Sequence, residues 1–418
     1  MRIAIVTFSD SRGGASKAAF RLHQSLVQAG EDSWMIVQQQ YSSDVKVIGP
    51  QSKVDKLISS TRSSMDSWPL KQEILKKNGF FSVNWVPFDR IRRKLRELKP
   101  DVIHMHWICG GMLRIESLAK LDVPVVWSLH DMWPFTGGCH YDNHCGKYMD
   151  VCGNCPILES SRPRDLSRWI FNRKKKTYSR IDNLTIVGLS HWMAECAKSS
   201  TLLSTRPVHY IPNPIDTELF NVINKHMARE LFKLPKDKKL ILFAAANPLG
   251  DPRKGSLELV QMLEVYDEPD TECVILGARN RHVTVDIHMP VHYVDTLHDE
   301  VSLVALYNAC DVTILPSRQE NLSNIALESL ACGTPVVAFD IGGNRDMVLH
   351  KKTGYIAKPF DHQDLKSGTI WVLDESRNKA VSCAARETVL DRFDQRQVVQ
   401  QYIRLYKDII SRWTGSCQ

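Results

Sequence analysis

Two glutamates, Glu320 and Glu328, lie at the start of a helix that the sequence predicts in its C-terminal half. An apolar run at 312–315 predicts a strand, and the periodic stretch at about 324–332 predicts a helix that the following glycine and proline end. The free N–H groups and positive dipole end of such a helix favour a diphosphate. Glu328, one turn into the helix, can accept hydrogen bonds from two ribose hydroxyls, and Glu320 can reach sugar hydroxyls beyond the phosphates. Alternatively, both are solvated charges that stabilise the helix start.

Neighbouring residues add donors to this helix start. Asn321, Ser323 and Asn324 can cap the helix and offer further hydrogen bonds to a phosphate. A second turn, Gly342-Gly343, follows the next predicted strand. Because parallel strands end at the same edge of a sheet, both turns are expected to open on one side of it.

A second candidate phosphate site reads Asp-Pro-Arg-Lys-Gly at 251–255 and follows a predicted strand at 240–245. A diphosphate that acts as a leaving group gains negative charge as its bond to the transferred group breaks. The cations of Arg253 and Lys254 would therefore stabilise the transition state more than the ground state. The alternative is a pair of basic side chains in a surface turn.

In the N-terminal half, a loop at 11–16 follows the first predicted strand and opens a helix predicted at 18–28. Gly13 and Gly14 would let the backbone approach a ligand closely, although the strict G-x-G-x-x-G spacing of dinucleotide-binding enzymes is absent. A plain tight turn is the alternative.

His130 ends another predicted strand, 125–129, so it is expected at the ligand-facing edge of the first sheet, where it can bond a sugar hydroxyl. His104 and His106 share one face of the preceding strand, and for them we expect packing roles.

Four cysteines, Cys139, Cys145, Cys152 and Cys155, crowd one loop. Four thiolates can bind one tetrahedral, structural zinc ion, with His140 and His144 as alternative ligands. Reduced thiols or a disulfide are the other interpretations. A catalytic metal is disfavoured, because four thiolates leave no open coordination position.

The segment 168–180 holds six basic residues and no acidic one, together with Trp169, Ile170 and Phe171. That composition fits adsorption to an anionic membrane surface, and a second basic helix is predicted at 90–99. A solvated helix face with Trp169 in the core is the alternative.

Glu320 and Glu328, with seven residues between them, and the following Ala-Cys-Gly-Thr-Pro-Val-Val at 331–337 resemble the E-x7-E signature of family 4 glycosyltransferases. The resemblance covers essentially the whole chain. It implies a two-domain, phosphorylase-like (GT-B) architecture and a retaining sugar transfer from a nucleotide-sugar donor without a divalent metal. It also implies that Glu320 contacts the donor sugar and Glu328 the ribose.

The resemblance extends to other motifs. Lys254-Gly255 resembles the family's phosphate element, which normally has an arginine about five residues earlier; that position is Leu249 here, and Arg253 is the candidate substitute. The glycines at 13 and 14 resemble the loop that places acceptor and donor phosphate, and the family has a histidine comparable to His130. A similar cysteine cluster occurs in a bacterial exopolysaccharide subgroup of the colanic-acid type.

The elements that must position these residues are strand-length apolar runs alternating with helix-period segments. This pattern predicts an α/β fold with two Rossmann-like doubly wound domains facing a cleft. Two prolines at 212 and 214 suggest a boundary, which gives an N-terminal acceptor domain at 1–210 and a nucleotide-sugar domain at 211–393. Apolar residues at helical spacing predict a terminal helix at 394–418 that crosses back onto the first domain.

Composition limits the class of protein. The chain has 418 residues, 43% apolar and 24% charged, which is typical of globular proteins. No apolar run reaches the roughly 18 residues of a membrane helix, and the first residues predict a strand rather than a signal peptide. Eleven cysteines, an odd number, favour reduced thiols. We therefore expect a cytoplasmic protein, with possible contact at the inner face of the plasma membrane.

The sequence thus predicts a glycosyltransferase of surface polysaccharide assembly, with a nucleotide-sugar donor, a lipid-linked or oligosaccharide acceptor, no nucleic-acid partner and no catalytic cofactor. Two rivals remain. A sugar-nucleotide epimerase shares the architecture and needs no acceptor, and a non-catalytic assembly protein would bind without turnover. Intact Glu320, Glu328 and Lys254 favour an enzyme over the second rival.

Overall fold

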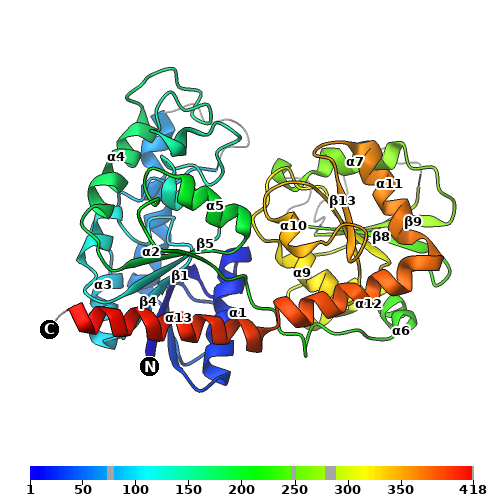
Figure 1. Ribbon diagram of the computed structural model, residues 1–418, viewed down its shortest axis with the longest axis horizontal. Helices are drawn as coiled ribbons and strands as arrows, with labels where there is room; N and C mark the ends of the chain where they lie inside the picture. The colour runs from blue at the N-terminus through cyan, green and yellow to red at the C-terminus, as the bar shows by residue number, and fades with distance from the viewer. Residues whose placement is uncertain (73–79, 246–250, 278–288, 417–418) are drawn as a thin grey trace. The chain divides into compact units, whose positions relative to one another are not determined.

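The computed structural model describes residues 1–72, 80–245, 251–277 and 289–416. The chain forms two compact units, one of Met1–Pro214 with Val398–Gln418 and the other of Ile215–Gln397. Each unit is a parallel β-sheet covered by helices (Figure 1). The prediction of two doubly wound α/β domains is confirmed.

The first unit contains a sheet whose described strands have the order β3-β2-β1-β4-β5-β6-β7, and every neighbouring pair is parallel. The strands are β1 (Arg2–Ser9), β2 (Asp32–Gln39), β3 (Val47–Ile48), β4 (Val102–Met105), β5 (Val125–Leu129), β6 (Leu184–Gly188) and β7 (Val208–Tyr210). The helices are α1 (Gly14–Gln28), α2 (Lys53–Asp66), α3 (Ile91–Leu98), α4 (Leu166–Tyr178), α5 (His191–Ser199) and α13 (Gln395–Ser416). Short 3₁₀ turns are η1 (Trp68–Gln72), η2 (Ile115–Lys120), η3 (Trp133–Phe135) and η4 (Lys147–Met149).

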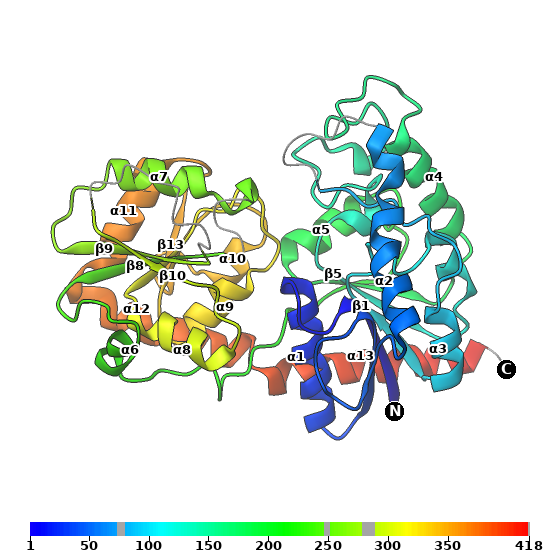
Figure 2. The same ribbon diagram turned by 180° about the vertical axis from the view of Figure 1, so that it is seen from behind.

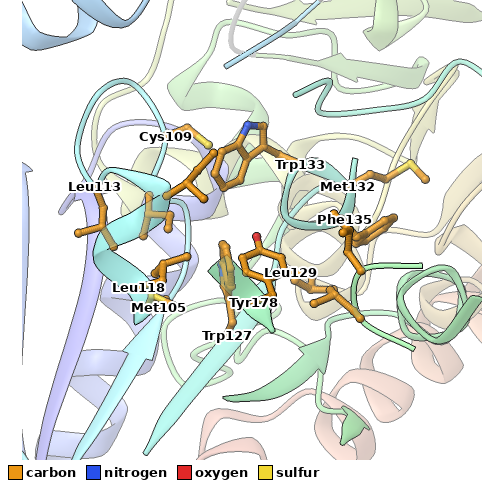
Figure 3. Packing of buried hydrophobic residues seen from close by; sticks show 14 of the residues in the cluster. Met105, Cys109, Leu113, Leu118, Trp127, Leu129, Met132, Trp133, Phe135 and Tyr178 are labelled. Atoms are coloured by element: carbon orange, nitrogen blue, oxygen red, sulfur yellow. The ribbon is translucent and has the colours of Figure 1, made fainter. Parts of the chain in front are cut away.

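Both faces of this sheet are buried, as continuous apolar runs such as β5 require. On one face, aromatic side chains fill the space between the sheet, η3 and α4 (Figure 3). The ring of Trp127 lies 6.2 Å from that of Trp133 and 6.2 Å from that of Tyr178. This core fixes the end of β5, where His130 follows.

The other face of the first sheet packs against α1 and α13. Val398, Tyr402, Leu405 and Tyr406 of α13 are buried there at the helical spacing that the sequence shows. Ile211 is buried in the same cluster, which explains why the first unit continues to Pro214, four residues beyond the boundary expected at 210.

The second unit contains a sheet whose described strands have the order β10-β9-β8-β11-β12-β13, again all parallel. The strands are β8 (Lys239–Ala244), β9 (Thr271–Leu276), β10 (Val291–Val294), β11 (Val312–Leu315), β12 (Val336–Phe339) and β13 (Gly354–Ala357). The helices are α6 (Lys225–Leu231), η5 (Pro252–Lys254), α7 (Ser256–Glu264), α8 (Glu300–Ala309), α9 (Asn324–Ala331), α10 (Asn344–Met347), α11 (His362–Leu373) and α12 (Glu375–Arg392). The strand order reverses between β8 and β11, the point at which open α/β sheets bind ligands.

Within the described ranges, no helix is both long enough and apolar enough to cross a membrane.

Candidate active site

Lys254 and Glu320 follow the two strands on either side of the reversal point of the second sheet. Lys254 ends η5, which comes after β8, and Glu320 lies in the loop after β11. The Lys254 Nζ atom lies 2.8 Å from Oε2 of Glu320, and the carboxylate is largely buried. Two residues 66 positions apart in the chain therefore form one charged pair at the carboxyl edge of the sheet, where open α/β sheets generally bind ligands.

Gly255 makes this pairing possible. Its φ is 76°, and an added Cβ would lie 1.8 Å from the carbonyl oxygen of Pro316, so only glycine fits. The close approach brings the Lys-Gly turn against the loop after β11, where the Arg318 N–H donates to the Arg253 carbonyl at 2.7 Å. The two loops are thus held together by backbone contacts.

Arg253 is bound by its own turn. Its guanidinium donates to both carboxylate oxygens of Asp251, at 3.0 and 2.7 Å. Burial alone would raise the pKa of Asp251, but the hydrogen bonds and charge of Arg253 outweigh it and lower that pKa. The expectation for Leu249 falls outside the described residues. Arg318, half exposed and 3.2 Å from Glu258, is a further cation at this edge that the sequence analysis missed.

Helix α9 carries the second glutamate. Its N-cap is Ser323, whose side chain accepts a hydrogen bond from the Ala326 N–H, and the cap and Asn321 are buried while Asn324 is half-buried. Glu328, one turn in, is 4% exposed. The Tyr307 hydroxyl of α8 donates to its Oε2 at 2.8 Å and fixes the carboxylate.

Tyr307 was also missed, because it lies 21 residues from Glu328 in a helix that shows no motif. Gly343, which the sequence analysis placed on the same side as Glu320, donates its N–H to the Glu320 carbonyl at 3.3 Å. The structure therefore gathers Lys254, Glu320, Gly343 and the start of α9 at one edge of the second sheet.

In the first unit, His130 follows β5 and is partly exposed. Its Nε2 lies 2.8 Å from Nδ1 of His106, which directly follows β4. Burial lowers the pKa of His130 to about 4, so the ring is neutral near pH 7. It can donate or accept a hydrogen bond there, but it is a poor general acid.

The next residue, Asp131, belongs to a different cluster. Its Oδ2 accepts from Nδ1 of His140 at 2.6 Å, and Nε2 of His140 lies 2.9 Å from the Ser82 hydroxyl. A serine hydroxyl, a histidine ring and an aspartate bonded in this sequence also form the catalytic triads of hydrolases. All three residues are buried, however, and the cluster ties the cysteine-containing loop to the end of β5.

The glycine loop lies at the start of α1. The helix begins at Gly14, four residues earlier than the predicted Ala18. Gly13 has a φ of 90°, and an added Cβ would meet nothing within 4 Å. Both glycines are exposed, so the loop leaves room for a ligand backbone or phosphate to approach.

Cys139, Cys152 and Cys155 are buried and Cys145 is half-buried; none of the four forms a disulfide. The Gly137 N–H donates to the Cys152 sulfur at 3.1 Å. Within the described residues, no three His, Cys, Asp or Glu side chains are arranged to hold a metal ion. A zinc site therefore stays a prediction.

In the basic segment 168–180, two side chains do not lie where we expected them. Arg173 forms an ion pair with Glu116 at 2.7 Å and donates to the Val83 and Asn84 carbonyls. Lys174 is completely buried, with its ammonium bound to the Trp133 and Thr136 carbonyls. The expectation that these two side chains face a membrane is wrong, because the fold uses both to hold neighbouring loops.

Family models match both units. The model described as Glycosyltransferase Family 4 matches residues 12–219, and the model described as Glycosyl transferases group 1 matches residues 225–388. The chain belongs to the family 4 glycosyltransferases. The predicted resemblance and the prediction of an enzyme are confirmed.

Two relatives illustrate the range of this glycosyltransferase family. The chain is 23% identical to the D-inositol 3-phosphate glycosyltransferase of Thermobispora bispora, over 75% of this chain and 71% of that one. It is 23% identical to the putative colanic acid biosynthesis glycosyl transferase WcaC of Escherichia coli K12, over 96% of this chain and 98% of that one. It spans only 59% and 60% of two further D-inositol 3-phosphate glycosyltransferases.

A solved structure has the same fold. The complex of Anabaena Alr3699/HepE with UDP-glucose aligns with 98% of this glycosyltransferase and 100% of that chain, at a TM-score of 0.65 and 15% identity. The two-unit GT-B architecture is therefore shared.

Proposed function

We propose that this glycosyltransferase moves a sugar, with retention, from a nucleotide-sugar donor to a glycan or lipid-linked acceptor in surface polysaccharide assembly. The observation that carries the proposal is the Lys254–Glu320 pair beside the start of α9, with Glu328 one turn into that helix. The Lys254 cation and the start of α9 match a diphosphate, Glu320 matches a sugar, and Glu328 matches a ribose. The HepE complex with UDP-glucose supports a nucleotide-sugar donor, and the similarity to WcaC, named for colanic acid biosynthesis, supports an exopolysaccharide pathway.

Each residue has a role in this proposal. Lys254, Arg253 and the start of α9, with Asn321, Ser323 and Asn324, bind the diphosphate, and Glu328 binds the ribose. Gly13 and Gly14 leave room for the acceptor and a phosphate. Glu320 contacts the donor sugar, and the neutral His130 bonds one of its hydroxyls.

The reaction follows from these charges. The bond between the anomeric carbon and the phosphate oxygen breaks, and its electron pair stays on the diphosphate, where Lys254 and the dipole of α9 stabilise the added charge. The acceptor hydroxyl attacks from the same face, and its proton passes to the leaving phosphate oxygen. Glu320, held by Lys254, acts on the sugar hydroxyls in this scheme and not as a nucleophile.

A donor screen tests the proposal. Nucleoside-diphosphate sugars are incubated with the protein and a lipid-linked glycan extract, and the released nucleotide and the anomeric configuration of the new linkage are measured. We expect transfer with retention that Glu320→Ala lowers. An epimerised sugar nucleotide formed without acceptor would instead show the epimerase reaction, and an inverted linkage would contradict the mechanism.

A further inference from the structure

Helix α2 is built with its polar side toward the protein. Asp66 is its only buried residue, and its carboxylate accepts from the Trp85 N–H at 3.1 Å. On the same side, Arg62 donates to the Gly111 carbonyl at 2.7 Å and Ser63 to the Gly110 carbonyl at 3.0 Å. A surface helix normally buries an apolar stripe, so this arrangement is reversed.

The outward side of α2 and of the following η1 carries four large apolar side chains among small polar ones. Val54 is 64% exposed, Leu57 65%, Met65 47% and Trp68 62%. With 3.6 residues per turn, these positions lie along one stripe. Only Ile58 among the large apolar side chains of α2 is partly buried. The others stay in water unless another surface covers them.

Phe88 extends the stripe. It is 92% exposed and has a φ of 56°, which is unfavourable for a bulky side chain. Its loop is bound to α2, because Arg62 donates to the Pro87 carbonyl at 3.0 Å and Arg90 pairs with Asp55. Figure 2 shows α2 at the front of the first unit, with α3 near one end of it.

Basic residues border the stripe. Lys53 and Lys56 of α2 and Arg93 and Arg96 of α3 are exposed. Segments 51–72 and 87–99 together contain ten Lys and Arg against four Asp and Glu, a net charge of +6 in a chain whose total is +7. Arg62, Arg90 and Lys94 are bound within the protein, so the charge available at this surface comes from the exposed basic residues.

We propose that this surface, the α2 face (Val54, Leu57, Met65, Trp68 and Phe88 with the bordering Lys53, Lys56 and Arg93), docks on an anionic lipid bilayer. The apolar side chains enter the boundary between headgroups and acyl chains, and the basic residues contact lipid phosphates. The combination of single exposed apolar side chains on a helix and a loop with flanking positive charge fits a bilayer better than a protein groove. The site is distinct from 168–180, where Arg173 and Lys174 are engaged internally.

Vesicle binding tests this inference on the full chain. Co-sedimentation uses vesicles of phosphatidylcholine with about 30% phosphatidylglycerol at low salt. The double variant Leu57→Glu, Phe88→Glu is expected to lower the partition coefficient at least about tenfold, because both changes place charge where apolar contact is lost. Lys53→Gln with Lys56→Gln is expected to weaken binding several-fold, with less salt dependence.

Matched substitutions on α4 are the control. Trp169→Ser with Lys175→Gln and Lys176→Gln alters exposed residues of the same types and is expected to leave binding within about twofold. Donor hydrolysis without vesicles reports on the proposed reaction separately, and it should be equal in all variants. The inference is overturned if wild type does not bind the vesicles, if the α2 double variant binds like wild type, or if the α4 variant loses as much. It is also overturned if wild type is an oligomer that the double variant converts to monomer, since the α2 face would then be a protein interface.

Discussion

Glu320 and Glu328 are held by different partners, and the difference predicts different roles. Glu320 forms an ion pair with a partly exposed lysine, which a bound diphosphate can attract away. Glu328 is fixed by a buried tyrosine hydroxyl, which no phosphate would compete for. At the scale of the residue, one carboxylate is therefore poised to change partners on donor binding and the other is preorganised.

Alanine variants distinguish the roles of Glu320 and Glu328. A ribose contact is present in donor, transition state and nucleotide product, so Glu328→Ala is expected to weaken binding of the free nucleoside diphosphate. Glu320→Ala is expected to leave that affinity nearly intact and to lower turnover, because contacts to the sugar strengthen as the anomeric carbon gains charge. One charge-assisted hydrogen bond of roughly 1.5 to 3 kcal/mol gives about a tenfold to hundredfold effect. Calorimetry with the diphosphate and steady-state assays measure both, and wild-type behaviour of both variants would remove the assignment.

Tyr307→Phe tests the preorganisation of Glu328. The variant removes one hydroxyl from a buried hydrogen bond and keeps the ring, so the fold is expected to hold. We expect nucleoside diphosphate affinity to fall several-fold, by about 1 kcal/mol, while kcat at saturating donor stays close to wild type. Tyr293→Phe, at a partly exposed position, is the matched control. A kcat loss larger than the affinity loss would show that Tyr307 acts on the reaction itself.

At the scale of the element, the loop between β5 and α4 carries three buried cysteines, Cys139, Cys152 and Cys155. Burial raises the pKa of Cys152 to about 12 in the absence of a cation. If zinc binds as the sequence predicts, the purified protein contains about one zinc, and Cys152→Ser lowers metal content and stability together. Cys383→Ser, at an exposed position in the second unit, is expected to change neither. Metal-free protein of full stability would refute the site.

The contact between β4 and α13 predicts sensitivity to acid. His104 is completely buried; its Nδ1 lies 2.6 Å from the Tyr406 hydroxyl and its Nε2 2.7 Å from that of Ser128. Burial lowers the pKa of His104 to about 3. Below its ordinary pKa of about 6.5, the unfolded chain binds a proton that the folded chain does not. Stability is therefore fully present above that pH and falls as the pH drops toward 3.

Denaturant titrations at several pH values measure this effect. As the pH falls, the free energy of unfolding of the first unit is expected to fall by about 1.4 kcal/mol per pH unit for each such histidine. His23 and His130, with pKa values lowered to about 4, add to this slope. His104→Gln is expected to reduce the slope. His226→Gln, at an exposed position, should leave it unchanged, and an equal slope in wild type and His104→Gln would contradict the argument.

Elements with strong apolar runs could be predicted from the sequence, and weaker ones could not. β5 and β11 are buried along their whole length and read as uninterrupted runs. β3 has two residues, and β10 is only partly buried, so neither gives a clear pattern.

The Lys254–Glu320 pair could not be predicted from the sequence either, because its geometry depends on how closely Gly255 approaches Pro316. Charge counting along 168–180 also failed for Arg173 and Lys174, since sequence composition does not show which basic side chains are used internally.

At the scale of the molecule, one chain builds two units, and α13 returns to the first of them after the second is complete. Ile215 and Gln395 lie side by side where the chain enters and leaves the second unit, joined by the Gln395 N–H donating to the Ile215 carbonyl at 3.0 Å. The first unit therefore needs residues from both ends of the sequence, whereas the second is continuous. This asymmetry predicts that damage to α13 affects the first unit alone.

Tyr402→Ala tests that asymmetry. Tyr402 is buried against the first sheet, and its hydroxyl lies 3.0 Å from that of Ser128. Removing a large buried aromatic side chain costs about 3–5 kcal/mol, which is a large share of a domain's stability. We expect calorimetry to show an unfolding transition that moves down by several degrees, and a second transition that keeps its Tm and still rises when a nucleoside diphosphate is added. Arg404→Ala, on the exposed side of α13, should shift neither. If Tyr402→Ala lowers both transitions equally, the two units unfold as one cooperative body, and the second depends on α13 as much as the first does.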